Sequence, residues 1–189
     1  MTDVTTPADD AADTTEPTPE PERYLGHLVS YSRGQRVIHV PRERLLDTAK
    51  QLHEDGYLMC IDVCGVDYLT FGRRTAAEGD IVTRPRSLPE GEQPERFEVV
   101  YQFLDHTERR RLRVRVQVPE DDAVVASLFE RYPGTEAMER EVYDMFGVSF
   151  DGHPDLSRIL MPEDWIGHPL RKDYSSGRIP VQFKGAPSR

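Results

Sequence analysis

Residues 97–118, FEVVYQFLDHTERRRLRVRVQV, decide the fold class. From Arg111 to Val118 apolar and polar side chains alternate, which is the period of a strand with one buried face. Residues 97–104 are rich in β-branched and aromatic side chains and predict a second strand. The polar tetrapeptide at 105–108 joins the two. The segment therefore predicts a β-hairpin, with the apolar residues of the alternating strand facing the core.

The same hairpin carries five arginines, at positions 109, 110, 111, 113 and 115. Such a ladder could form a nucleic-acid face, but no aromatic residues interleave with it as platforms for stacked bases. We interpret it as a solvated sheet face that also discourages edge pairing. No nucleic-acid partner is expected.

Towards the N-terminus the pattern predicts a strand, a helix and another strand. Residues 37–40 read as a short strand, and Pro41 fits the first turn of a helix over residues 42–54 that Gly56 ends. Residues 57–69, YLMCIDVCGVDYL, are an apolar run rich in strand-forming residues. They predict a strand that is buried on at least one face.

Both cysteines of the chain, Cys60 and Cys64, fall in this run. Their C-x3-C spacing differs from the C-x2-C of zinc and iron–sulfur sites. Four residues apart on a strand they would lie ~13 Å apart, which is too far for a disulfide. We expect two small buried side chains.

Towards the C-terminus two helices are predicted. The acids after Pro119 suit the start of a helix that runs to about Arg131. A second helix over residues 136–146 has an apolar stripe and ends at Gly147. Together these elements predict a small α/β core.

Composition divides the chain into three parts. Residues 1–22 combine four prolines with seven acids and no base, which predicts a disordered acidic leader. Residues 23–150 form the α/β core, with a long loop at about 70–95. Residues 151–189 lack periodicity, yet contain the only tryptophan. We expect an extended arm that becomes ordered by lying on another surface, as a partner-docking segment would.

Charge and hydropathy limit the class of protein further. The 189 residues carry a formal net charge of −10, and the mean hydropathy is −0.62. No segment approaches the ~20 apolar residues of a membrane-spanning helix, and the opening residues lack the pattern of a secretory signal. We expect a soluble chain without a membrane span of its own.

Carboxylates on the second helix are the first candidates for chemistry. Glu139, Glu141 and Asp144 could include an acid–base pair, but no nucleophile or phosphate-binding glycine loop is near. Arg140 and Arg158 are placed to neutralise them. We interpret the group as helix-surface ion pairs, including Arg140 with Asp144, and as a cap for the arm.

Two Gly-His-Pro tripeptides are the second candidates. His153 and His168 could bind a metal together with Asp155 or Asp164, but they lie in proline-rich chain rather than on a rigid helix. Each is better explained as a hydrogen-bonding anchor in a turn. The polar cluster at 171–174 could clamp a phosphate or carboxylate, or pair with a partner. No metal site and no catalytic residue is predicted.

The segment from Glu139 to Tyr174 resembles the C subunit of the proton-pumping NADH:quinone oxidoreductase, respiratory complex I. The match covers about a fifth of the chain. Ala137 and Ser175 depart from the usual family pattern. The residues that carry the resemblance, and that it implies for partner docking, are Glu139, Arg140, Glu141, Asp144, Gly147, Gly152, His153, Pro154, Asp155, Arg158, Asp164, Trp165, Gly167, His168, Pro169, Arg171, Lys172, Asp173 and Tyr174.

The resemblance implies an α+β fold, a two-layer α/β core with a mixed β-sheet, followed by the arm. It implies a hydrophilic peripheral-arm subunit that binds no cofactor itself, while FMN and iron–sulfur clusters lie in partner subunits. NADH and quinone are then substrates of the whole complex. The implied partners are the quinone-site D subunit and the iron–sulfur B and I subunits.

The implied location is the cytoplasmic side of the bacterial cell membrane, reached only through the complex. An alternative is the equivalent subunit of a related membrane-bound hydrogenase, or of a quinone-reducing dehydrogenase with another electron donor. Genes for FMN- and NADH-binding subunits beside this one would favour the first possibility.

Overall fold

The fold is that of a computed structural model, which describes residues 22–69 and 95–175. Nearly all of the acidic leader and the long loop, and residues 176–189 of the arm, lie outside the described residues. Along the chain the elements are β1 (Arg23–Tyr24), β2 (His27–Ser32), β3 (Gln35–His39), the 3-10 helix η1 (Arg42–Arg44), α1 (Leu45–Glu54), β4 (Met59–Asp67), β5 (Phe97–Asp105), β6 (Arg110–Val118), β7 (Val124–Ala126), η2 (Pro133–Thr135), α2 (Glu136–Phe146) and β8 (Ser149–Asp151).

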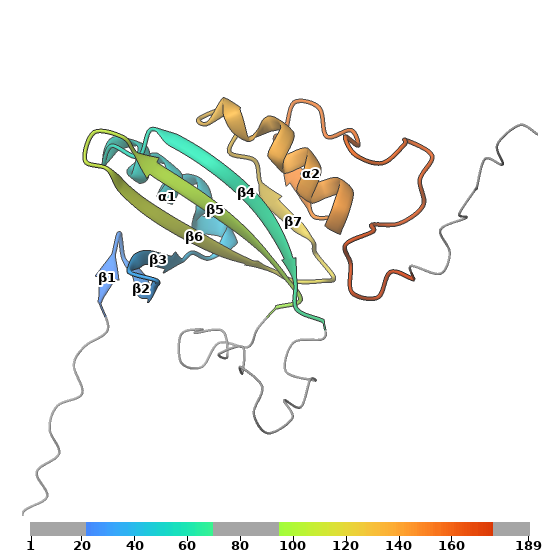
Figure 1. The fold of residues 1–189 in the computed structure, drawn as a ribbon, viewed down its shortest axis with the longest axis horizontal. Coiled ribbons are helices and arrows are strands. Elements are labelled where there is room, and N and C mark those ends of the chain that lie inside the picture. Colours follow the sequence, from blue (N-terminus) through green and yellow to red (C-terminus); the bar gives the residue numbers. More distant parts are fainter. Residues whose placement is uncertain (1–21, 70–94, 176–189) are drawn as a thin grey trace, which may run out of the picture.

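The main sheet has the strand order β1-β2-β3-β6-β5-β4 (Figure 1). Only the β3–β6 pair is parallel, so the sheet is mixed. The predicted hairpin is confirmed as β5–β6, paired from Phe97↔Val118 to Asp105↔Arg110. At its turn the Asp105 carboxylate accepts the N–H groups of Thr107 and Glu108 at 2.9 and 3.0 Å.

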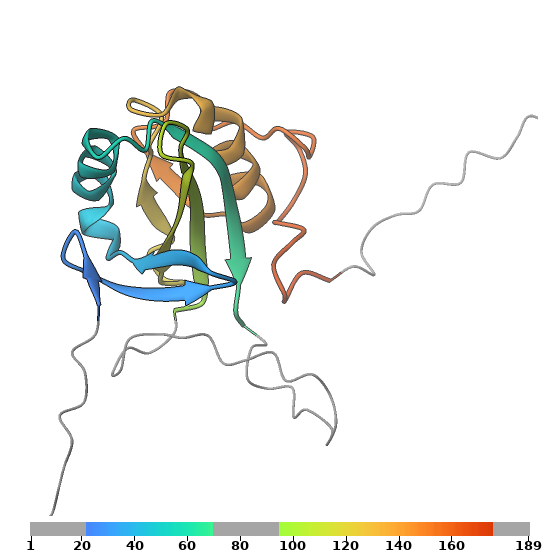
Figure 2. The same cartoon turned by 60° about the vertical axis from the view of Figure 1, so that its left-hand side comes forward.

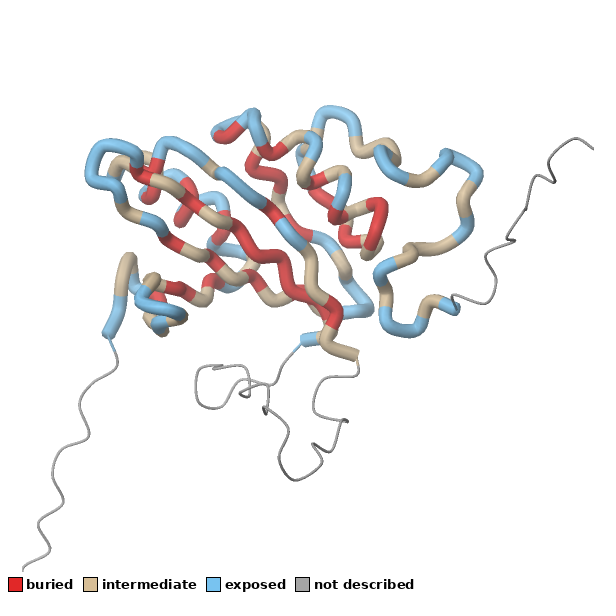
Figure 3. Tube along the Cα trace, viewed as in Figure 1, coloured by how far each residue is buried: buried red, intermediate tan, exposed pale blue. Residues whose placement is uncertain are grey.

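Both α-helices pack on one face of this sheet, so the core is a single layer between helices and strands. Leu112, Val114, Val116 and Val118 are fully buried there, as their alternation predicts. Figure 2 separates α1 from α2, and Figure 3 shows the buried positions gathered along β5 and β6 and on α2. The predicted two-layer α+β fold with a mixed sheet is confirmed.

The helix predicted between residues 119 and 131 is wrong. The valines of this stretch form β7, which pairs in parallel with β8. The chain then makes one turn, in which the Leu128 carbonyl accepts the N–H groups of Arg131 and Tyr132 at 3.1 and 2.8 Å. The β-branched residues favour a strand. The partner strand, β8, follows α2, so the sequence of residues 119–131 does not indicate the pairing.

The other predicted elements lie close to those observed. The helices over 42–54 and 136–146 are confirmed, the first with an initial 3-10 turn. The strand at 37–40 begins earlier, at Gln35, because it forms a hairpin with β2. Strands β1 and β2 were not predicted. The sequence feature that indicated the β2–β3 hairpin was the Arg33-Gly34 turn, in which both residues have positive φ.

Strand β4 corrects the expectation for the cysteines. Its pairing with β5 shifts register between Cys60 and Asp62, and this bulge breaks the alternation of faces. Cys60 is half-buried and Cys64 is exposed, because β4 is the last strand of the sheet and Cys64 lies on the face without helices. The prediction of two buried cysteines is therefore wrong.

The arginine ladder has a different role from the one expected. Strand β6 lies between β3 and β5, so its arginines protect no sheet edge. Arg115 donates to the fully buried Glu98 carboxylate at 2.8 Å and to the Tyr68 hydroxyl at 2.9 Å. Arg109 and Arg111 are exposed, and the other three arginines of the ladder are half-buried. The ladder is thus partly a buried polar network.

After β8 the chain winds beside α2 as the orange-to-red segment of Figure 1. We call residues 151–175 the described arm. The surface it lies on is its own domain. Across the described ranges, no helix has the length and apolar character needed to span a membrane.

Candidate functional site

The arm docks on the C-terminal end of α2, and Asp144 organises this site. Its side chain is fully buried. One carboxylate oxygen accepts the N–H groups of Ile159, Leu160 and Met161 at 3.2, 2.8 and 2.8 Å. The other accepts from the Arg158 guanidinium at 2.6 Å. The arm therefore folds around a single carboxylate, which is the cap expected from the sequence.

The electrostatics of Asp144 follow from these bonds. Burial alone would raise its pKa, but the backbone N–H groups and Arg158 outweigh that effect, and the pKa is lowered. The predicted Arg140–Asp144 pair is wrong, because Arg140 bonds to Glu136, one turn earlier, at 3.3 Å. Asp144 pairs with Arg158 instead.

The last carbonyl groups of α2 are capped by the arm. The His168 imidazole Nδ1 donates to the Asp144 carbonyl at 3.0 Å, and the Leu170 N–H donates to Met145 at 3.0 Å. Arg171 Nε donates to the Phe146 carbonyl at 2.6 Å. These groups have no partner within a helix, and a cation suits the negative end of the helix dipole.

Gly147 makes this capping possible. Its φ of +73° turns the chain out of the helix, and its N–H donates to the Tyr143 carbonyl at 2.8 Å. A Cβ at this position would lie 2.5 Å from both His168 Nε2 and Arg171 Nη2. The His168 and Arg171 side chains occupy the space that a larger side chain at position 147 would need.

The first half of the arm is held by the start of α2. His153 Nε2 donates to the Glu136 carbonyl at 3.1 Å, while its Nδ1 accepts the Asp155 N–H at 3.1 Å. Arg140 donates to the carbonyl and hydroxyl of Ser157 at 3.1 and 2.9 Å. Both histidines are therefore hydrogen-bonding anchors, as predicted.

Glu139 differs from the surface residue that we expected. It is fully buried, with Ser127 Oγ donating to it at 2.6 Å and the Leu128 N–H at 2.8 Å. Burial raises its pKa, and these bonds lower it by less. Glu139 thus joins α2 to the turn after β7, whereas Glu141 is exposed.

The far end of the arm is bound at the junction of β4 and β5. Asp67, at the end of β4, is fully buried as a side chain and accepts the Lys172 N–H at 2.8 Å. Arg96 bridges Asp67 at 3.2 Å and Asp173 at 2.7 Å, and also contacts Glu120. We call Asp67, Arg96 and Asp173 the distal latch. Asp67 and Arg96 lie outside the family signature, and no sequence spacing relates them to the arm.

Several of the remaining signature residues lie in turns of the arm. Gly152 and Gly167 have φ of +82° and +88°. The Tyr174 ring lies against Gly167, where a Cβ would be 2.9 Å from it. A cavity of about 740 Å³ opens here, and its lining residues are Asp164, Trp165, Ile166, Gly167, Asp173, Tyr174 and Ser175. Pro154 is exposed, and Pro169 is half-buried.

Four large apolar side chains of the arm are exposed. Ile166 is 90% exposed, and Leu160, Leu170 and Ile159 are 54%, 50% and 41% exposed. We call these four residues the arm face. The N–H groups of Ile159 and Leu160 bond to Asp144, and that of Leu170 bonds to Met145. Ile166 precedes Gly167, whose carbonyl accepts from Arg158 at 3.0 Å.

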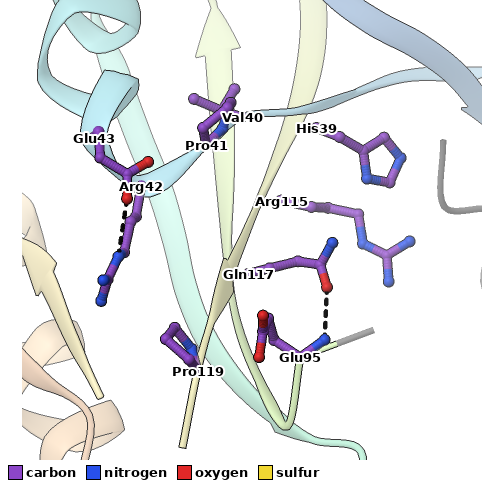
Figure 4. A pocket seen from close by; sticks show the side chains of 9 residues that line it. All are labelled: His39, Val40, Pro41, Arg42, Glu43, Glu95, Arg115, Gln117 and Pro119. Atoms are coloured by element: carbon purple, nitrogen blue, oxygen red, sulfur yellow. Dashed lines mark hydrogen bonds and ion pairs between the residues drawn. The ribbon is translucent and has the colours of Figure 1, made fainter. Parts of the chain in front are cut away.

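Within 22–69 and 95–175 no three His, Cys, Asp or Glu side chains gather to hold a metal. Burial raises the pKa of the Cys60 thiol to about 12, so it remains protonated. A second cavity of about 450 Å³ is lined by His39, Arg42 and Arg115 among others, and Figure 4 shows Arg42 paired with Glu43. No signature residue lines it.

Comparison with known proteins identifies the family. The family described as "Respiratory-chain NADH dehydrogenase, 30 Kd subunit" matches residues 38–179. The chain belongs to this family. The match includes both the core and the arm, so the 30 kDa family accounts for the fold and for the signature residues together.

Individual relatives support this family assignment. The NADH-quinone oxidoreductase C subunit of Saccharopolyspora erythraea is 44% identical over 84% of this chain, which spans 56% of that relative. The same-named protein of Nocardia farcinica is 43% identical over 82% of this chain and 54% of its own length. The chain thus spans a little over half the length of these curated relatives.

Solved structures give the same fold. One titled as Nqo5 of the trypsin-resistant fragment matches with a TM-score of 0.56 and 31% identity, covering 69% of this chain and 90% of that one. A chain of the membrane-bound sulfane sulfur reductase, an archaeal respiratory membrane complex, also has a TM-score of 0.56, at 21% identity, covering 79% and 78%. The second likeness concerns the fold alone.

Proposed function

We propose that this chain is the C subunit of NADH:quinone oxidoreductase, a hydrophilic peripheral-arm subunit without a redox centre. Its role is to brace the quinone-site and iron–sulfur subunits while electrons pass from NADH to quinone and protons are translocated. The observation that carries the proposal is the exposed arm face on a backbone fixed by family-signature residues. Among the described residues nothing in its own domain covers this face.

The partners and cofactors follow from that role. The arm face docks on the quinone-site D subunit, beside the iron–sulfur B and I subunits. FMN and the iron–sulfur clusters are bound by partner chains, and NADH and quinone react there. The chain lies on the cytoplasmic side of the bacterial cell membrane and reaches the membrane only through the complex.

The physical argument is one of apolar area. Large exposed side chains scattered singly are normal on a protein surface. Four of the ten large apolar side chains that are exposed among the described residues lie within residues 159–170, and such a concentration favours an interaction site. Interface energy also concentrates in a few well-packed residues, often aromatic. The arm supplies such residues in Ile166 and in the half-buried Trp165. These features favour a bracing subunit over an enzyme that acts alone.

The test is affinity purification of the tagged chain from its own host, with mass spectrometry of the proteins that accompany it. We expect the FMN- and NADH-binding subunits together with the quinone-site and iron–sulfur subunits. Recovery of a membrane-bound hydrogenase, or of an assembly without NADH-binding subunits, would support the alternative complex. Recovery of the chain alone would contradict the proposal.

A further inference from the structure

The distal latch holds the arm beside the arm face, since Asp173 of the latch and Ile166 of the arm face line the same cavity. Asp67 and Arg96 flank the segment between β4 and β5, and the arm reaches them only at Lys172 and Asp173. In Figure 1 the red end of the arm lies near the lower end of β4. The latch joins parts of the chain that are about a hundred residues apart, as the separation of 105 between Lys172 and Asp67 shows.

The latch differs from an ordinary surface ion pair. The side chains of Asp67 and Arg96 are 0% and 7% exposed, so water and salt screen their interaction weakly. Asp67 also accepts the Leu69 N–H at 2.9 Å, and Arg96 lies 4.8 Å from the centre of the Phe97 ring. The Arg171 guanidinium lies over the same ring at 5.1 Å. Asp67 and Arg96 are therefore built into the core, whereas Asp173 on the arm is half-exposed.

The Asp144 cluster at residues 159–161, the end of α2 at residues 168–171 and the latch at residues 172–173 hold the arm at three points. Ile166 lies between the first and second points in the sequence, and Leu170 lies close to the latch. A chain fixed at both ends samples fewer conformations than a chain fixed at one. A partner binds a fractionally populated conformation more weakly, in proportion to that fraction.

We propose that Asp67 and Arg96 are positioning residues for partner binding. They keep the arm in its binding conformation in the free subunit, although neither belongs to the arm face. This inference rests on the proposed function, because it assumes that the arm face binds another subunit. The affinity of the arm for its partner then depends partly on residues at the β4–β5 junction.

The first experiment is hydrogen exchange on the isolated full-length chain. In the wild type we expect protected amides at Leu170, Lys172 and Tyr174, which donate to Met145, Asp67 and Arg171. Asp67→Asn should speed exchange at Lys172 and Tyr174 at least tenfold and at Leu170 by less, because Met145 on α2 still accepts the Leu170 N–H. The amides of residues 159–161, bound to Asp144, should stay protected.

Two further variants keep the result interpretable. Asp173→Asn removes a half-exposed carboxylate on the arm itself, so it loosens the latch without disturbing the core. Asp105→Asn is the matched control. Its carboxylate is also buried, accepts two backbone N–H groups and pairs with Arg110 at 2.6 Å, but it lies at the opposite end of β5. It should leave exchange in the arm unchanged.

The second experiment measures binding by competition. Tagged variant and untagged wild-type chains are co-expressed in the host, and their ratio in the purified complex is compared with their ratio in the lysate. We expect Asp67→Asn and Asp173→Asn to be under-represented about fivefold or more, and Asp105→Asn to be incorporated like the wild type.

Two results would overturn the inference. One is unprotected amides at 170–174 in the free wild-type chain, and the other is unchanged exchange or incorporation in both latch variants. A wild-type chain that joins no complex would instead overturn the proposed function and the binding half of this inference. The exchange data would still decide whether the latch holds the arm.

Discussion

Gly147 carries two functions that are usually separate. Its φ of +73° ends α2 in the left-handed conformation, which costs about 1–2 kcal/mol for a residue with a side chain. It also leaves the space through which His168 and Arg171 reach the helix end. A substitution would therefore strain the backbone and displace the arm.

We expect Gly147→Ala to destabilise the chain more than the left-handed conformation alone would. Losing the hydrogen bonds of His168 and Arg171 should add about 1–3 kcal/mol, at roughly 0.5–1.5 kcal/mol each. The measurement is urea unfolding combined with hydrogen exchange in the arm. Gly34→Ala is the control, since Gly34 has φ of +76° and nothing within 4 Å of its Cβ position. Equal losses in the two variants would contradict the capping role.

Residue identity alone predicted some of these roles and not others. The histidines were recognisable as turn anchors, because glycine and proline on either side fix the backbone. Asp144 was recognisable as a cap. The burial of Glu139 was not, since its partner Ser127 follows strand β7, in a stretch that the acids after Pro119 led us to predict as helix. Asp67 and Arg96 meet the arm only through the tertiary fold.

Helix α2 contacts strand β4 at Gly65, where the missing side chain leaves room for the Phe146 ring. A Cβ there would lie 2.6 Å from Phe146 Cδ2 and 2.9 Å from Cε2, well inside van der Waals contact. The sequence shows Gly65 as a weak point in a strand, whereas the structure shows it as the place where helix and strand approach most closely. The gap sets how near α2, and with it the arm, lies to the sheet.

We expect Gly65→Ala to lower the free energy of unfolding by about 1–3 kcal/mol, as overpacking does. In a Phe146→Ala background the same change should cost much less, because the ring that it meets is gone. Chemical denaturation of the four variants of this cycle gives the coupling. Gly134→Ala, with nothing within 4 Å of its Cβ, should be nearly neutral. Additive losses would show that the contact is not the cause.

Strand β2 and helix α1 meet at a buried polar pair. His27 is 5% exposed, and its Nε2 lies 2.9 Å from Thr48 Oγ1. Burial lowers the pKa of His27 below its ordinary value of 6.5, and the charges of Arg44 and Arg23 act in the same direction. The unfolded chain therefore binds this proton first as the pH falls.

It follows that His27 contributes stability above about pH 6.5 that is lost as the pH falls towards its lowered pKa. His168, whose pKa burial also lowers, acts in the same sense. We expect His27→Gln to flatten the decline in unfolding free energy between about pH 7 and 5, as measured by urea denaturation at each pH. His106→Gln, in the exposed hairpin turn, should leave the slope unchanged. An identical slope in His27→Gln would refute the assignment.

The elements that the sequence predicted best are those whose burial is decided by their own periodicity, such as β6 and α2. Strand β7 was missed because its partner β8 follows α2, whereas β2 pairs with its neighbour β3 and was indicated only by the Arg33-Gly34 turn. The arm is the extreme case. It has no period of its own, because its backbone groups bond to side chains and helix ends rather than to a regular ladder.

Taken as one molecule, the chain uses its signature residues to hold the arm and leaves the arm face open. That division makes a specific prediction for Ile166, which is 90% exposed. Ile166→Asp should leave the unfolding free energy within about 0.5 kcal/mol of the wild type. In the purified complex it should be under-represented at least tenfold, because a charge would be buried at the docking surface.

Leu46 supplies the matched control for this variant. It is a similarly large apolar residue, 54% exposed, and lies on α1 rather than on the arm. Leu46→Asp should be equally neutral for folding and should enter the complex as the wild type does. If both variants assemble normally, the arm face is not the docking surface. If both fail, α1 belongs to the interface as well, and the partner covers more of the domain than its arm.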